Sequence, residues 1–267
     1  MNILMCPICR QRLNQKQSSW QCDNGHSYDQ AKQGYVNLHV VQHKHSKSPG
    51  DTPESVLARR AFLSGGFYQP LRDAVIEKIK HLSVDTLLDI GCGEGYYTSA
   101  MQSVVKQCIG FDIAKTAIQH AAKTNRNVNW VVATSATIPV LDESVDLCTS
   151  LFSPIPQAEI LRVLKNSGYL IVVTPAAEHL YAMREALFDE VKQHEPEKFV
   201  TQLEADFELI DAQCIETELH LTQVDLKNLI AMTPYAYKAK AEKRQMLEQQ
   251  SQFQLTAQFQ IYIFKKR

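Results

Sequence analysis

The 267-residue sequence contains no apolar run close to the roughly 20 residues that a membrane-spanning helix needs. Its first residues also lack the basic stretch followed by an apolar one that marks a secretion signal. Internal repeats and low-complexity segments are absent as well. We therefore expect a cytoplasmic globular protein without membrane contact, long enough for one α/β domain of ordinary size and one small domain.

Disulfide bonds are not expected either. The seven cysteines are an odd number, and in a reducing compartment thiols stay reduced. Four of them stand singly in or beside apolar runs and are predicted to be core residues: Cys92, Cys108, Cys148 and Cys214. The other three lie close together near the amino end and call for a different explanation.

The amino-terminal cysteines have the spacing of a zinc site. Cys6 and Cys9 form a Cys-x-x-Cys pair, and after twelve residues Cys22 is followed by His26. Two such pairs can surround one tetrahedral Zn²⁺, which would stabilise a segment too short to build a core of its own. A redox Cys-x-x-Cys pair would sit in a βαβ pattern, which is not seen here. The sequence predicts one structural zinc ion.

The charge of the chain is unevenly distributed. Residues 1–60 contain eight Lys/Arg and four Asp/Glu, whereas the remainder contains 20 and 25. Three thiolates and one imidazole on Zn²⁺ would lower the net charge of the front part from +4 to about +3. Within this front part, the polar segment 42–53 contains four residues that can carry positive charge, two of them histidines. This pattern suits contact with a polyanion such as RNA, although a solvated surface explains it equally well.

The stretch from Leu87 to Thr98 predicts the main ligand site. An apolar strand ends in an acid and three glycines follow at alternate positions, and a second acid ends the next apolar strand. A dinucleotide fingerprint would place the third glycine three residues after the second, whereas here it comes after two. The spacing therefore favours S-adenosylmethionine over NAD. The predicted cofactor residues are Asp89, Gly91, Gly93, Gly95 and Asp112.

The apolar pattern predicts a class I S-adenosylmethionine-dependent methyltransferase fold, an α/β doubly wound, Rossmann-like sheet. Strands are expected over 86–90, 108–111, 128–133, 145–151 and 169–174, and helices over 54–62, 71–81, 95–104, 114–124, 157–164 and 179–194. Two late strands, 207–221 and 253–265, would form an antiparallel edge hairpin with a helical insertion over 222–250. The predicted domains are a zinc-binding domain whose basic charge suits RNA recognition (1–38, the zinc domain), a basic linker and helix (39–65) and a methyltransferase domain (66–267).

Several acceptor chemistries find no support in the sequence. Enzymes that methylate exocyclic amines often have an Asp/Asn-Pro-Pro-aromatic run after the fourth strand, where this chain has Phe152-Ser153-Pro154-Ile155-Pro156. Methylation of pyrimidine C5 needs a nucleophilic cysteine beside proline, and Cys148 has no such neighbour. No catalytic triad is visible, and methyl transfer from a sulfonium needs none.

The whole chain resembles the RlmA family, bacterial 23S rRNA (guanine-N1-)methyltransferases. The matching stretches are Cys6-Pro7-x-Cys9 with Cys22-x₃-His26, Ala31–Leu38, Val41–Lys44, Pro49–Asp51, Ala58–Leu63, Tyr68–Asp73, Leu88–Thr98, Thr174-Pro175 with His179-Leu180, and Met232–Pro234. The chain departs from the family at Lys165–Gly168, where relatives often have Lys-Pro-Gly-Gly, and in the loop 152–157, where the target base should enter.

This resemblance implies a function. The donor would be S-adenosylmethionine, the target N1 of a guanine in a hairpin loop of 23S rRNA, and the enzyme a homodimer. By position, Tyr68, Gly93, Glu94 and His179 would contact the cofactor, and Cys6, Cys9, Cys22 and His26 would bind zinc. The resemblance names no catalytic base.

Without the family resemblance, the residues leave three other functions to consider. The chain could methylate a small molecule, with the zinc domain docking a protein partner, but the basic front part disfavours that. It could be a non-catalytic zinc RNA-binding protein, which the intact glycine motif opposes. A dehydrogenase is disfavoured by the glycine spacing.

Overall fold

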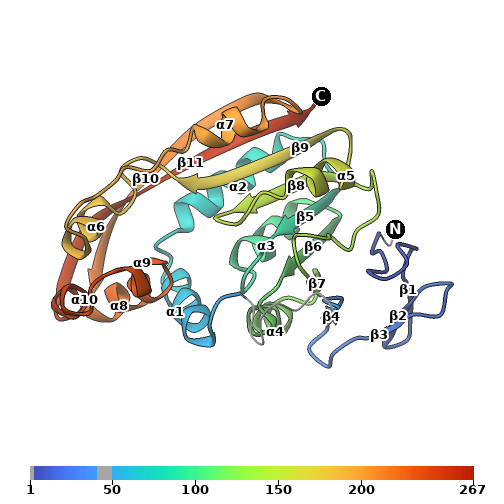
Figure 1. The fold of residues 1–267 in the computed structure, drawn as a ribbon, viewed down its shortest axis with the longest axis horizontal. Helices are drawn as coiled ribbons and strands as arrows, with labels where there is room; N and C mark the ends of the chain where they lie inside the picture. Colours follow the sequence, from blue (N-terminus) through green and yellow to red (C-terminus); the bar gives the residue numbers. More distant parts are fainter. Residues whose placement is uncertain (1–2, 41–49) are drawn as a thin grey trace.

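The computed structural model describes residues 3–40 and 50–267 and contains two sheets (Figure 1). The basic residues predicted between 41 and 49 lie outside the described part. A small antiparallel sheet is formed by β1 (Asn14–Lys16), β2 (Ser19–Gln21) and β3 (Ser27–Asp29). It belongs to the zinc domain, which lies at one side of the large sheet.

The large sheet has eight strands in the order β10-β11-β9-β8-β5-β6-β7-β4. The strands are β4 (Val36–Asn37), β5 (Thr86–Ile90), β6 (Gln107–Asp112), β7 (Asn129–Val132), β8 (Val145–Leu151), β9 (Leu164–Pro175), β10 (Phe207–Thr222) and β11 (Gln252–Lys266). The strands from β4 to β9 pair in parallel, whereas β11 is antiparallel to both β9 and β10. The predicted class I fold with its antiparallel edge hairpin is confirmed.

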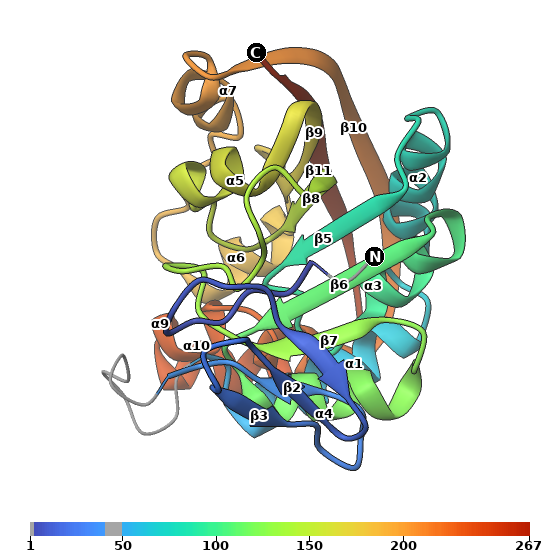
Figure 2. The ribbon, with the colours of Figure 1, turned by 90° about the vertical axis from the view of Figure 1, so that its right-hand side faces the viewer.

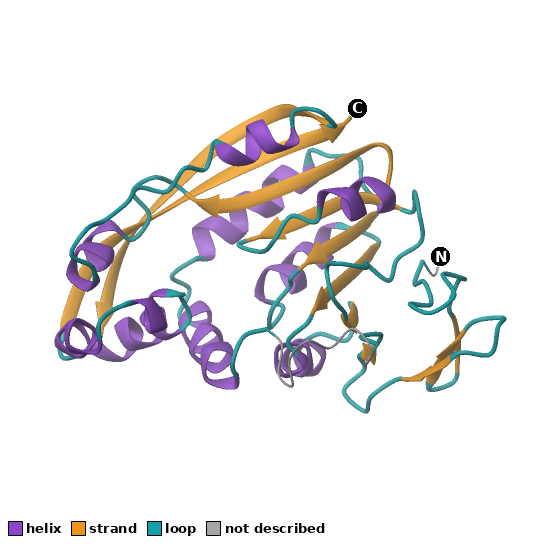
Figure 3. Ribbon diagram, in the orientation of Figure 1, coloured by secondary structure: helices purple, strands orange, loops and turns teal. Residues whose placement is uncertain are grey.

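Helices cover both faces of this sheet (Figure 3). They are α1 (Pro53–Ser64), α2 (Gln69–Lys80), α3 (Tyr96–Met101), α4 (Lys115–Thr124), α5 (Gln157–Val163), α6 (Tyr181–Leu187), α7 (Lys198–Leu203), α8 (Gln223–Ala231), α9 (Tyr235–Lys238) and α10 (Ala241–Glu248). A 3₁₀ turn, η2 (Gln102–Val104), follows α3. The helices α8, α9 and α10 occupy the segment between β10 and β11.

The inner strands of the sheet, such as β5, β6 and β8, are apolar on both faces, because the sheet lies between two cores. Leu87 and Leu88 are neighbours on β5 and enter opposite cores. The core on the Leu87 side contains residues of α2, α3 and α4, and the core on the Leu88 side contains residues of α5, α7 and the zinc domain. Figure 2 shows α2 and α3 on one side of the strands and α5 and α7 on the other.

The zinc domain is joined to the large sheet at two places. Near its start, Leu4 forms a bridge with Val140, and the N–H of Met5 donates to the carbonyl of Pro139 at 2.9 Å. Near its end, β4 pairs in parallel with β7. The boundary predicted at residue 38 thus follows a short strand that belongs to the large sheet.

Two expectations from the sequence were wrong. The helix expected over 179–194 is only α6, because the buried Arg184 donates to the carbonyls of Lys192 and Ala177 and the chain folds back around it. Cys214 was expected in the core but is exposed. It lies on edge strand β10, where most side chains are exposed or half-buried. Cys108 and Cys148 are buried as expected, and Cys92 is partly buried.

Within the described residues, no helix has the length and apolar character needed to cross a membrane.

Candidate functional site

The glycine loop between β5 and α3 has a backbone that only glycine adopts without strain. Gly91, Gly93 and Gly95 have φ values of +69°, +56° and +84°. A Cβ on Gly95 would lie 2.5 Å from the Trp130 ring and 2.9 Å from the Ala121 side chain. The loop is also tied to β6 by hydrogen bonds to the Phe111 carbonyl. The glycine loop, held between β5 and β6, therefore offers its backbone to a ligand in a defined conformation.

Asp112 ends β6 beside this loop. Its Oδ2 accepts from the N–H of Gly93 at 2.9 Å, and its Oδ1 accepts from the N–H of Ala114 at 2.7 Å. Burial raises the pKa of Asp112, and these two N–H groups oppose the rise. Each carboxylate oxygen keeps acceptor capacity after these bonds, so the group could also accept the two hydroxyls of a ribose.

Asp89 faces the interior. Its carboxylate is buried and accepts from the hydroxyls of Thr98 at 2.5 Å and Thr149 at 2.7 Å, which joins β5 to α3 and β8. Burial raises the pKa of Asp89 to about 6, although both hydroxyls act in the opposite direction. Asp89 therefore stabilises the fold beneath the glycine loop by linking β5 to α3 and β8.

This raised pKa predicts how stability changes with pH. Because the folded protein holds the Asp89 proton more tightly than the unfolded chain, about 3 kcal/mol of stability present below about pH 4 should be lost as the pH rises to about 6. Asp89→Asn cannot ionise and should remove this component. Urea unfolding of both proteins between pH 4 and 7 measures the difference, and parallel curves for the two would contradict the prediction.

Tyr68 and His179 are far apart in sequence and lie against the same ring. The centroid of the Phe259 ring is 4.7 Å from that of Tyr68 and 4.8 Å from that of His179. His179 Nδ1 is 2.7 Å from the Gln258 carbonyl, and burial lowers the pKa of His179 to about 3, so the ring is neutral and donates from Nδ1. The two residues expected from resemblance thus meet in one cluster.

A row of rings connects this cluster with the glycine loop. Phe152 follows β8, and its ring centroid lies 5.6 Å from that of Phe259 and 6.4 Å from that of Tyr97 on α3. Phe152 has φ of +57° and is 44% exposed, although it is a large apolar residue. An exposed aromatic side chain on a strained backbone is a typical feature of a binding site. Sequence reasoning identified the loop but not these contacts.

Glu94 lies in the glycine loop and is partly buried. Burial raises the pKa of Glu94, while the charges of Arg60 and Arg59 on α1 lower it. Both arginines belong to a stretch that resembles the family, but the sequence indicates no role for them. Their proximity to the glycine loop becomes visible only in the folded chain.

The second candidate site contains Cys6, Cys9, Cys22 and His26. Their ligand atoms all lie within 4.8 Å of one another. The Sγ atoms of Cys9 and Cys22 are 3.5 Å apart, and His26 Nδ1 lies 3.6 Å from Cys6 Sγ and 3.4 Å from Cys22 Sγ. A tetrahedral zinc ion with these ligands separates them by about 3.5 to 3.8 Å, so three thiols and one imidazole in this arrangement fit one structural zinc.

The local structure explains this convergence. Gly25, with φ of +82°, closes a turn in which its N–H donates to the Cys22 carbonyl at 3.0 Å, and this turn returns His26 to the cysteines. The Tyr28 hydroxyl lies 3.3 Å from Cys6 Sγ and could donate to a thiolate there. Trp20 is buried in the same core as Cys6 and Cys22.

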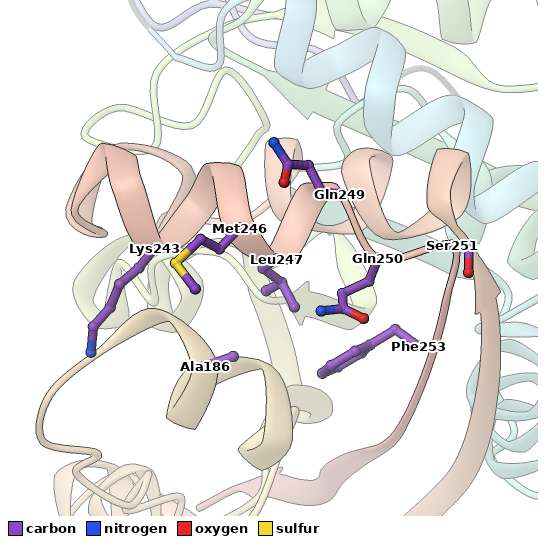
Figure 4. Close-up of a pocket in the computed structure, with 8 residues that line it drawn as sticks. All are labelled: Ala186, Lys243, Met246, Leu247, Gln249, Gln250, Ser251 and Phe253. Carbon is purple, nitrogen blue, oxygen red and sulfur yellow. The ribbon is translucent and has the colours of Figure 1, made fainter.

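One cavity in the described structure lies away from both candidate sites. It measures about 660 Å³ and is lined by residues of α6, α10 and the start of β11 (Figure 4). A second cavity of about 300 Å³ lies between residues 30–34, α4 and β7. Neither contains a residue of the glycine loop, so the candidate site is defined by its backbone geometry and not by cavity size.

Comparison with known families gives two matches along this chain. Residues 4–47 match the amino-terminal zinc-ribbon model of RlmA, and residues 88–172 match a methyltransferase domain model. The first match contains all four residues of the Cys/His cluster, and the second contains the glycine loop and Asp112.

Similar proteins also span most of the chain. A 23S rRNA (guanine(748)-N(1))-methyltransferase from Streptomyces fradiae is 31% identical over 242 residues, 88% of this chain and 85% of that protein. A Bacillus subtilis protein named provisionally as a 23S rRNA (guanine-N(1)-)-methyltransferase is 30% identical over 99% of this chain and 98% of its own length. Among solved structures, the YcgJ protein from Bacillus subtilis superposes with a TM-score of 0.50 at 19% identity, covering 73% of this chain and 97% of that one, which supports the fold.

Proposed function

Because the chain belongs to the RlmA family of 23S rRNA (guanine-N1-)methyltransferases, we propose that it methylates N1 of a guanine in a hairpin loop of 23S rRNA. It is an S-adenosylmethionine-dependent rRNA methyltransferase. The observation that carries the proposal is the presence, on one chain, of the Cys/His cluster and of the glycine loop with Asp112 beside it.

The cofactor half of the site follows from the geometry of the loop. S-adenosylmethionine, when bound, supplies a methyl group made reactive by its sulfonium. We propose that the backbone of Gly91, Gly93 and Gly95 cradles it and that Asp112 accepts its ribose hydroxyls. Glu94, Tyr68 and His179 would complete the pocket, and Asp89 would hold the loop from beneath.

The aromatic row would receive the guanine. A base taken from a hairpin loop costs little to unstack, and an exposed ring such as Phe152 gives it a surface to stack on. Tyr68, Phe259 and His179 would exclude water behind it. Positioning of the acceptor and exclusion of water are the main contributions that an enzyme makes to methyl transfer from a sulfonium.

The zinc domain would recognise the RNA. We propose that Cys6, Cys9, Cys22 and His26 bind one structural zinc and that residues 1–38, with the linker and helix over 39–65, contact the phosphate backbone. The methyltransferase domain would then comprise residues 66–267. We further propose that the enzyme acts in the cytoplasm as a homodimer.

The proposal predicts a single modified nucleotide. Labelled S-adenosylmethionine and 23S rRNA from cells lacking this gene should give incorporation and a new primer-extension stop at one loop guanine, because N1 methylation blocks Watson–Crick pairing. Label without a stop would assign the methyl group to another atom and contradict the N1 proposal. Absence of label on free rRNA and on ribosomal precursors would contradict rRNA methylation itself.

A further inference from the structure

Arg59 on α1 reaches the glycine loop from outside the large sheet. Apart from Cys92 and Glu94, the chain neighbours of Gly93, the one heavy atom of the described residues within 4 Å of the position that a Cβ on Gly93 would occupy is Arg59 Nη1, at 3.8 Å. The side chain is 27% exposed. A guanidinium therefore stands beside the most open glycine of the loop, where a bound ligand would touch the backbone.

Two contacts fix the orientation of this guanidinium. Its Nη1 donates to the carboxylate of Asp51, and its Nη2 donates to the Met232 carbonyl at 3.3 Å. Asp51 lies just before α1, and Met232 ends α8, so Arg59 is held between two segments distant in sequence. A guanidinium has five N–H donors, and these contacts use two of them. The remaining N–H groups can donate to a ligand.

The surroundings of Arg59 are acidic. Burial raises the pKa values of Asp112 and Glu94, and the charge of Arg59 opposes the rise at both. Together with Asp51, these groups place three carboxyl groups around one guanidinium. Such a rim suits the sulfonium and ammonium groups of S-adenosylmethionine, but it repels the carboxylate at the end of the same molecule unless a cation is present.

We propose that Arg59 binds the carboxylate of the methionine moiety of S-adenosylmethionine, with Asp51 and Met232 as positioning residues. The planar fork of arginine matches a carboxylate in a way that a lysine ammonium does not. Arg60, the next residue on α1, has its Nη1 3.4 Å from His120 Nδ1, and it acts on the glycine loop through its charge on Glu94. The inference rests on the proposed cofactor site but not on the identity of the acceptor.

The test compares two ligands that differ only in this group. Calorimetry should show that the wild-type protein binds S-adenosylmethionine about 10- to 100-fold more tightly than its decarboxylated analogue, the range expected for charge-assisted hydrogen bonds. Arg59→Met should bind both ligands with similar, weak affinity, and Arg59→Lys should restore part of the difference. Because no RNA is present, failure here would leave rRNA methylation untouched.

A matched control uses the neighbouring arginine. Arg60→Met removes the same charge from the same helix and should retain the wild-type ratio between the two ligands. Equal affinity of the wild-type protein for both ligands would overturn the proposal without any variant, and so would an unchanged ratio in Arg59→Met. Circular dichroism and zinc content would establish that each variant is folded.

Discussion

Replacing Cys22 by alanine should release the metal and reduce rRNA methylation by at least about 100-fold, while cofactor affinity changes by less than about threefold. Metal binding supplies the folding free energy of small zinc domains, and here it would hold Cys22 and its neighbours in the core that they share with the Leu88 side of the sheet. The glycine loop lies in a different part of the fold. Zinc content, calorimetry with S-adenosylmethionine and the rRNA assay would measure the three quantities.

Cys214→Ala is the matched control for this change. Cys214 is exposed on edge strand β10 and lies outside the Cys/His cluster, so zinc, cofactor affinity and activity should all remain at the wild-type level. If Cys22→Ala lost cofactor affinity and activity to the same extent, this would contradict the proposal that the zinc domain recognises RNA while the glycine loop binds the cofactor independently. Full activity of a zinc-free protein would contradict the proposed role of the metal.

Replacing Asp112 by alanine should weaken binding of S-adenosylmethionine by at least about 100-fold. The change removes the acceptor of the Gly93 and Ala114 N–H groups, which releases the glycine loop from the end of β6. It also removes the group proposed to hold the ribose hydroxyls. Asp112→Asn keeps one carbonyl oxygen and should give an intermediate loss, measured by the same calorimetry.

Asp85→Ala provides the comparison for Asp112. Asp85 pairs with Lys106 on the surface, where both side chains are more than half exposed, and such pairs contribute little to stability. This variant should bind the cofactor as the wild type does. An Asp112→Ala protein with wild-type affinity would show that the carboxylate does not hold the ligand and that the loop keeps its conformation without it.

Much of the fold could be predicted because the inner strands of the sheet, such as β5 and β8, are apolar on both faces. Leu87 and Leu88, or the run around Leu170, have no solvent-facing side, and this pattern alone indicates a covered parallel sheet. The length of α6 could not be predicted, since it depends on buried Arg184 binding carbonyls of a later segment. The exposure of Cys214 depends on strand order, which no local pattern contains.

The site divides in the same way. Spacing is sufficient to identify residues that act within one loop, such as the three glycines, or at the end of the next strand, such as Asp112. Tyr68 and His179 were expected only from the resemblance, because a single tyrosine or histidine beside an apolar run carries no signal of its own. Arg59 and Phe152 gain their positions from tertiary packing and from a backbone torsion, which the sequence does not display.

The two attachments of the zinc domain, one at Leu4 and one at β4, have a consequence for substrate choice. Hydrogen bonds to the sheet near both ends of the zinc domain restrict its movement relative to the glycine loop. Under the proposed function, a hairpin bound at both places would have to span the distance between the zinc domain and the glycine loop, so the length of its stem should affect methylation. Hairpins with one base pair inserted into or removed from the stem should lose methylation even when the loop sequence is unchanged.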